Sequence, residues 1–128
     1  MLEKGIKKTL ESKVTEENTA KAMGSGELMV YATPAMIALM EETAYKSVAT
    51  ELDEGCGSVG TRMDVKHIAA SPVGMPITCK SELVEVDGRR LVFHVEAFDE
   101  NGLIGEGTHE RFIVVNEKFQ NKTDSKLD

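Results

Sequence analysis

The sequence predicts an α+β fold, in which one long helix packs against an antiparallel β-sheet of about five strands. The first observation is a single strong helical pattern, from Pro34 to about Leu52, that ends before a pair of glycines. The second is a series of alternating segments that follow this helix without another helix between them. The third is a pair of tight-turn signals, Asp87-Gly88 and Asn101-Gly102, which join consecutive strands as hairpins.

Length and composition bound the class of protein. With 128 residues the chain fits a single domain, for which we expect the boundaries 1–128, with residues from about 117 to 128 forming a frayed tail. Hydrophobic residues make up 41% and charged residues 29% of the chain, a balance typical of globular rather than disordered proteins. The formal net charge of −7 leaves no broad basic surface for a phosphate backbone, so we expect no nucleic-acid partner.

Further classes are excluded by what the sequence lacks. Charged residues interrupt every apolar stretch well before the roughly 18 residues that span a bilayer, so no membrane partner is expected. The N-terminal residues lack the apolar region of a secretory signal, which favours a cytoplasmic protein. Cys56 and Cys79 stand without CxxC spacing or a histidine cluster, so the sequence predicts neither a disulfide framework nor a metal site.

The long helix begins with a recognisable start signal. Thr33 precedes Pro34, a pair typical of an N-cap residue with proline at the first helical position. Glu41 falls within the stripe of side chains that the helix is expected to bury, whereas Glu42 shares another face with Lys46 and can pair with it in water. The stripe consists of Met36, Ile37, Met40, Ala44, Ser47 and Val48.

The remaining regular segments are predicted to be strands. Alternation along the first strand after the helix places His67 on the same face as Met63 and Val65, together with Thr61 and Ala69. His67 is therefore expected to point toward the apolar interior. The predicted strands are Ile6–Val14 at an edge, then Ser58–Ala70, Ile77–Val86, Arg89–Phe98 and Leu103–Val115.

A second copy of the chain is expected to complete this layout. One helix of about 18 residues cannot cover both faces of a five-stranded sheet and all of its edges. We therefore predict a homodimer, with pairing of dimers into a tetramer left open.

Three residues are candidates for chemistry. The helix N-terminus at Thr33 offers free N–H groups and a positive dipole end, which suit a developing oxyanion or a phosphate. Glu41 can act as a general base on water, and His67 can act as acid or base. Thr33 and Glu41 lie eight positions apart, or about 12 Å along the helix, so they can flank one groove without touching.

Each candidate also has a purely structural interpretation. Thr33 alone is typical of an N-cap, His67 of a satisfied core or interface histidine, and Glu41 can pair across a dimer interface. His94 alternates away from the apolar residues and is predicted to lie on the surface, while His109 receives no assignment.

Several segments taken together resemble the fluoroacetyl-CoA thioesterase-like branch of the hotdog superfamily. The likeness spans most of the chain, and its specificity comes from the order of the motifs. They are Val30–Met36 leading into Leu39–Glu41, then Gly57–Thr61, Val65–Pro72, Glu85–Leu91 and Gly107–Arg111.

The resemblance implies a hotdog fold, an antiparallel sheet wrapped around one long central helix, with two active sites at a dimer interface. It implies hydrolysis of acyl-CoA thioesters by Thr33, Glu41 and His67, the residues already selected above. It further implies that Gly60 lies close to the acyl group and that Arg111 shapes or charges the acyl pocket, both as substrate-binding residues.

One departure from the family bears on the substrate. Fluoroacetate-resistance enzymes carry phenylalanines shortly before the helix that form a hydrophobic lid, whereas residues 22–29 read AMGSGELM here. We therefore predict a thioesterase for short- to medium-chain acyl-CoA rather than one selective for fluoroacetyl-CoA.

Two catalytic routes and two rival functions stay open at this point. Thr33 can attack the thioester and form an acyl-enzyme, or Glu41 can direct water onto the carbonyl in one step. A non-catalytic acyl-CoA binding or sensing protein is the alternative function, and a hydratase is a second enzyme alternative, although its Asp and His motif is missing. No cofactor is predicted, with CoA present only as part of the substrate.

Overall fold

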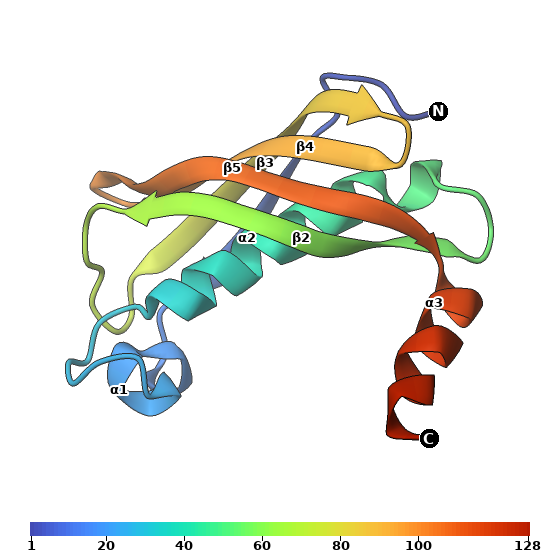
Figure 1. The fold of residues 1–128 in the computed structure, drawn as a ribbon. Coiled ribbons are helices and arrows are strands. Elements are labelled where there is room, and N and C mark those ends of the chain that lie inside the picture. Colours follow the sequence, from blue (N-terminus) through green and yellow to red (C-terminus); the bar gives the residue numbers. More distant parts are fainter.

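The computed structural model describes all residues from Met1 to Asp128 and confirms the predicted α+β arrangement (Figure 1). Short 3₁₀ turns at 16–18, 49–51 and 125–127 supplement the regular elements. None of the helices combines the length and apolar composition that crossing a bilayer requires. The elements are β1 (Lys7–Lys13), α1 (Ala20–Met23), α2 (Thr33–Val48), β2 (Cys56–His67), β3 (Pro76–Asp87), β4 (Arg90–Asp99), β5 (Gly102–Val115) and α3 (Asn116–Asp124).

The five strands form one antiparallel sheet in the order β1-β3-β4-β5-β2. The predicted hairpins are confirmed, since tight turns join β3 to β4 and β4 to β5 in register. β1 lies at one edge, as predicted for the first segment, and β2 lies at the other. The edge of β2 that faces away from β5 has no neighbouring strand, so its backbone groups are available to another strand.

Helix α2 lies across one face of the sheet (Figure 1) and supplies five of the fifteen buried residues of the core. Met36, Met40, Ala44 and Val48 are fully buried, as the predicted stripe requires. They pack with the inward side chains of the sheet, because alternate residues of each strand point toward the helix. The sheet contributes chiefly Ile77, Cys79, Leu83, Leu91, Phe93, Val95, Ala97 and Ile104.

Close contact between helix and sheet depends on Gly105 of β5. A Cβ atom at this position would lie 2.6 Å from the sulfur of Met36 and 2.9 Å from the carbonyl oxygen of Lys66. No side chain fits there without moving backbone or core atoms. The glycine therefore sets how closely the first turn of α2 approaches β5 and β2.

The outer face of the sheet contradicts one of the reasons given for predicting a dimer. Lys80, Glu82, His94 and Glu96 project from this face, and His94 lies there at the surface, as predicted. A face with these charged and polar side chains needs no cover, so the expectation that both faces must be shielded is wrong. The unpaired edge of β2 is the feature that still calls for a partner.

Two further segments differ from the sequence-based expectation. A bulge between Gly60 and Arg62 makes Thr61 an extra residue, so the simple alternation along β2 is interrupted and Thr61 is exposed. Residues 116–124, expected to fray, form α3, which projects away from the sheet beyond the end of β5 (Figure 1). No residue of α3 is buried, which is why its pattern gave no core signal.

Candidate active site

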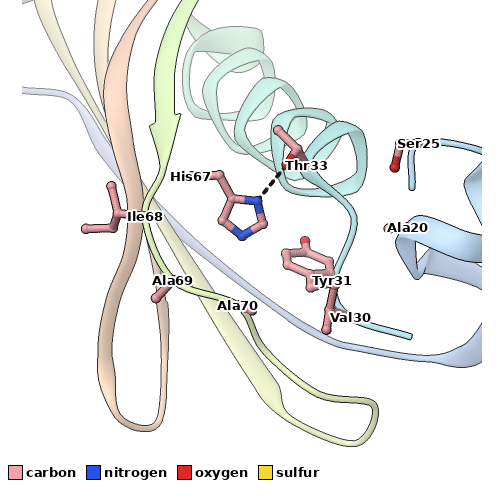
Figure 2. Close-up of a pocket in the computed structure, with 9 residues that line it drawn as sticks. All are labelled: Ala20, Ser25, Val30, Tyr31, Thr33, His67, Ile68, Ala69 and Ala70. Atoms are coloured by element: carbon pink, nitrogen blue, oxygen red, sulfur yellow. Dashed lines mark hydrogen bonds between the residues drawn. The ribbon is translucent and has the colours of Figure 1, made fainter. Parts of the chain in front are cut away.

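Thr33 and His67 form a directly hydrogen-bonded pair. The hydroxyl oxygen of Thr33 lies 2.8 Å from Nδ1 of His67, although the two residues are 34 positions apart (Figure 2). Thr33 is the first residue of α2 and His67 is the last residue of β2, so the helix start and the strand end meet here. An alcohol next to an imidazole is the arrangement that activates a nucleophile.

The N-cap interpretation of Thr33 is wrong. Ala32 occupies the N-cap position, and no side chain caps the helix there. Pro34 still lies in the first turn, where its missing N–H costs nothing. The hydroxyl of Thr33 is thereby free to bond His67, beside the N–H groups that a helix N-terminus leaves without internal partners.

The surroundings of His67 keep its ring neutral. Burial lowers the pKa of His67 from its ordinary value of 6.5, against a smaller opposing effect from the backbone of Ala69. The ring of Tyr31 meets His67 edge-on, with centroids 6.4 Å apart. A neutral imidazole accepts the Thr33 proton at Nδ1 when its own proton is on Nε2.

Nε2 of His67 is buried and has no hydrogen-bond partner within the chain. A satisfied core histidine would have both nitrogens bonded, so this interpretation does not fit. His67 instead faces a cavity of about 270 Å³ that lies in front of the helix start (Figure 2). The cavity is lined by Ala20, Ser25, Val30, Tyr31, Thr33, His67, Ile68, Ala69 and Ala70.

Glu41 lies in a second group of residues, farther along α2. One of its carboxylate oxygens is 3.7 Å from Nη1 of Arg111, and the Glu41 side chain is 44% exposed while that of Arg111 is 8% exposed. Glu41 therefore lies at the margin of the buried stripe and is not an unpaired buried charge. Its neighbour Glu42 pairs with Lys46 at 2.5 Å on the helix surface, as predicted.

Gly60 belongs to the same group. A Cβ at Gly60 would lie 2.5 Å from an oxygen of Glu41, 3.3 Å from the ring of His109 and 3.4 Å from Nη1 of Arg111. The bulge at Thr61 directly follows Gly60 in β2. These contacts define one group, named the Glu41 group, which consists of Glu41, Gly60, His109 and Arg111.

Within one chain the three predicted catalytic residues do not all meet. The structure brings Thr33 and His67 together, and it separately brings Glu41 together with Gly60 and Arg111. Eight helical positions separate Thr33 from Glu41, which corresponds to about 12 Å along the axis. The chain thus carries two part-sites on one helix.

Sequence reasoning missed His109, Ser58 and the two tyrosines that border the part-sites. His109 and Arg111 alternate on β5 and so share a face, a signal that is present in the sequence. Ser58 bonds the Arg111 side chain, and Tyr45 lies with its ring 5.7 Å from the guanidinium carbon. These contacts join residues of different strands and of the helix, so no local sequence pattern predicts them.

Gly60→Ala is expected to lower kcat by about tenfold and to leave the thermal unfolding midpoint within a few degrees of wild type. The added methyl displaces the Glu41 carboxylate, which ends a flexible side chain and can move at little cost to the fold. Steady-state kinetics beside a thermal melt measure both effects. Unchanged kcat would show that the position of Glu41 is not critical.

The lowered pKa of His67 also predicts the pH profile. If the neutral ring takes the Thr33 proton, kcat/KM stays level around pH 7 and falls only as the pH drops below 6.5. The sign follows because a lowered pKa keeps the imidazole unprotonated to more acidic pH. A profile measured from pH 5 to 9 tests this, and an acid limb centred above pH 6.5 would contradict it.

Comparison with known proteins places this geometry in a family. A family model described as fluoroacetyl-CoA-specific thioesterase matches residues 14–117. The fluoroacetyl-CoA thioesterase of Streptantibioticus cattleyicolor is 44% identical to this chain over 97 residues, which cover 76% of the chain and 70% of the relative.

Solved structures agree with both sequence matches. The fluoroacetyl-CoA thioesterase FlK superposes with a TM-score of 0.92 at 37% identity, covering 98% of each chain. A hot-dog-like protein from Thermanaerovibrio acidaminovorans superposes with a TM-score of 0.89 at 24% identity, covering 98% of this chain and 93% of the other. The fold is a hotdog fold, as the resemblance implied.

Proposed function

This chain belongs to the fluoroacetyl-CoA-specific thioesterase family, and we propose that it hydrolyses short- to medium-chain acyl-CoA thioesters to the free acid and CoA. Its class as a thioester hydrolase follows from the family. The observation that carries the catalytic proposal is the Thr33–His67 hydrogen bond at a helix N-terminus that faces a cavity. Nucleophile, base and oxyanion donors are the parts that acyl transfer needs.

In the proposed first step, the Thr33 oxygen attacks the thioester carbonyl while Nδ1 of His67 takes its proton. The carbonyl oxygen becomes an oxyanion beside the free N–H groups of α2. The carbon–sulfur bond then breaks, and the acyl group stays on Thr33 as an ester. CoA leaves as a thiolate that takes a proton from solvent, and His67 keeps the proton of Thr33. The hydrogen bond favours this route over direct water attack for the first step.

The proposed second step releases the acid. Glu41 takes a proton from water, the resulting hydroxide attacks the acyl ester, and the Thr33 oxygen leaves with the proton held by His67. Glu41 then returns its proton to solvent. Of the two routes considered from the sequence, the proposal takes the acyl-enzyme route, and Glu41 acts as general base in its second step. The cycle needs no metal or organic cofactor, because these side chains supply base, nucleophile and oxyanion stabilisation, and we expect chelators to leave the rate unchanged.

We also propose a homodimer in which Thr33 and His67 of one copy face Glu41 of the other. The separation of about 12 Å along α2 supports this, because Glu41 cannot reach the Thr33 of its own chain. The free edge of β2, twelve residues long, can pair with the same edge of a second copy and continue the sheet. Exposed apolar side chains border the two part-sites: Ile68, 58% exposed, lines the cavity, and Tyr45, 43% exposed, lies beside Arg111.

Light scattering at micromolar concentration is expected to give twice the 14.0 kDa of one chain, or a higher even multiple if dimers pair further. Introducing a proline at Val65, near the C-terminal end of the edge strand, should shift the mass toward one chain and lower activity with it. A fully active protein with the mass of one chain would show that the active site is not shared between two copies.

The acyl group is proposed to be short to medium in length. Residues 22–29 lie next to the cavity-lining Ala20 and include Ser25, and they contain no phenylalanine that could form a hydrophobic lid. A cavity of about 270 Å³ accommodates a few carbon atoms beyond the thioester. The proposal includes a cytoplasmic location, with which the unpaired thiols of Cys56 and Cys79 agree.

Release of the CoA thiol from a panel of acyl-CoAs tests the proposed function. The panel runs from acetyl to palmitoyl and includes fluoroacetyl-CoA and phenylacetyl-CoA. We expect turnover of one chain-length class, with no preference for fluoroacetyl over acetyl. Binding of acyl-CoA without thiol release from any member would move the protein to the class of non-catalytic acyl-CoA sensors.

A further inference from the structure

We propose that His109 and Ser58 are positioning residues that anchor Arg111 so that it supports Glu41 without occupying the carboxylate oxygens. The inference rests on the proposed function of Glu41 as general base. It concerns two side chains that neither the family resemblance nor the sequence pattern assigned. Both side chains bond Arg111, and neither bonds Glu41 directly.

His109 is an almost wholly buried histidine whose two ring nitrogens are both engaged. The residue is 1% exposed, and its ring stacks on that of Phe93 with centroids 6.1 Å apart. Nδ1 lies 2.8 Å from the carbonyl oxygen of Arg62, and Nε2 lies 3.2 Å from Nη1 of Arg111. The ring is thus fixed between the β2 backbone and the guanidinium.

The chemistry of these contacts defines the state of the ring. A guanidinium can only donate hydrogen bonds, so Nε2 of His109 accepts from Arg111. A carbonyl can only accept, so the ring proton is on Nδ1 and is donated to Arg62. One neutral tautomer satisfies both contacts, and burial, which lowers the pKa of His109, favours the neutral form.

Ser58 holds the other side of the guanidinium. Nε of Arg111 donates to the hydroxyl of Ser58 at 2.8 Å, and Nη2 donates to the carbonyl oxygen of Ser58 at 2.7 Å. Together with His109, these contacts engage all three nitrogens of Arg111. A buried cation with every nitrogen bonded to a fixed partner has little freedom to reorient.

The anchoring explains the distance between Arg111 and Glu41. Their closest atoms are 3.7 Å apart, well beyond the roughly 2.7–2.9 Å of a direct charge-assisted hydrogen bond. An unanchored arginine would swing toward Glu41 and form a paired, two-point contact that occupies both oxygens. The anchors hold the guanidinium beside Glu41 at this distance, while an oxygen of Glu41 stays available to bind water.

Two substitutions at His109 separate the contact with Arg111 from the contact with the strand. Asparagine can replace the Nδ1 donor to Arg62 but is too short to reach Arg111. Glutamine is long enough to place its amide oxygen near the position of Nε2 and so to accept from Arg111. His94→Asn, the same change at a surface histidine of β4, is the matched control.

We expect His109→Asn to lower kcat by about tenfold with little change in KM, and His109→Gln to recover most of that loss. His94→Asn should retain the wild-type rate, and thermal melts of all three variants check the fold. Ser58→Ala should lower kcat in the same sense. The double variant His109→Asn/Arg111→Met should have a kcat no lower than that of Arg111→Met alone, because both changes remove the same function of Arg111.

A spectroscopic measurement makes the test independent of turnover. ¹⁵N NMR of the wild-type protein should show His109 as the neutral tautomer with its proton on Nδ1; a proton on Nε2 would overturn the proposal. If Glu41→Gln is inactive while His109→Asn keeps the wild-type rate, the anchoring is wrong and the function of Glu41 stands. If Glu41→Gln is fully active, the proposed function of Glu41 itself fails, and the tautomer still reports on the His109–Arg111 contact.

Discussion

Thr33→Ala is expected to lower kcat for acyl-CoA hydrolysis by about a thousandfold, the largest effect of any single substitution in the chain. The change removes the proposed nucleophilic oxygen and leaves His67 without the hydroxyl now 2.8 Å from its Nδ1. The residual rate comes from water attack assisted by Glu41 and the helix N-terminus. Thiol release followed at saturating substrate measures the loss directly in kcat.

Thr33→Ser is the control for this prediction, because serine keeps a hydroxyl at the same position and lacks only the methyl group. It should retain activity within about tenfold of wild type, because it can still form and release the acyl ester. A Thr33→Ala variant with near wild-type kcat would mean that water attacks the thioester directly and that Thr33 only orients His67.

Glu41→Gln is expected to lower kcat by roughly a hundredfold or more, in line with the contribution of a general base. Glutamine has the shape of glutamate, so the space next to Gly60 and the approach to Arg111 are preserved. It cannot accept the proton of water, so release of the acyl group from Thr33 becomes slow. The defect therefore lies in the second half of the reaction.

The thiol released in the first turnover shows which half of the reaction is slow in this variant. A rapid burst of thiol, equal to the number of active sites, should precede slow turnover in Glu41→Gln, because acylation still proceeds. Glu42→Gln is the matched control, since Glu42 is the next residue of the helix and pairs only with Lys46 at the surface. Slow turnover without a burst would instead assign Glu41 to the first step.

Local sequence patterns predicted most of the fold. The stripe of Met36, Met40, Ala44 and Val48 identified α2, and turn dipeptides identified the hairpins, because both signals are local in the sequence. The bulge at Thr61 was not predictable, since it is defined by the register of β2 against β5. The helix α3 was missed because it buries no residue and so shows no apolar stripe.

The site was predictable in its residue types but not in its grouping. Thr33 was assigned correctly as a residue at the helix start, yet its hydroxyl bonds a histidine from a distant strand instead of capping the helix. His109 was passed over although Arg111, two residues along the same strand, is a local partner, because its other partner is the backbone of Arg62 on the neighbouring strand β2. Such pairings depend on strand register, which no single segment encodes.

The placement of Thr33 and Glu41 on one helix, too far apart to serve one site, has a genetic consequence. In the proposed dimer each helix gives its start to one site and its middle to the other. Two chains that are each inactive, one lacking Thr33 and the other Glu41, would then form mixed pairs in which one site carries both defects and the other carries neither. Two defective alleles could thus restore function when expressed together. Selection at these two positions would then act on the dimer and not on a single chain.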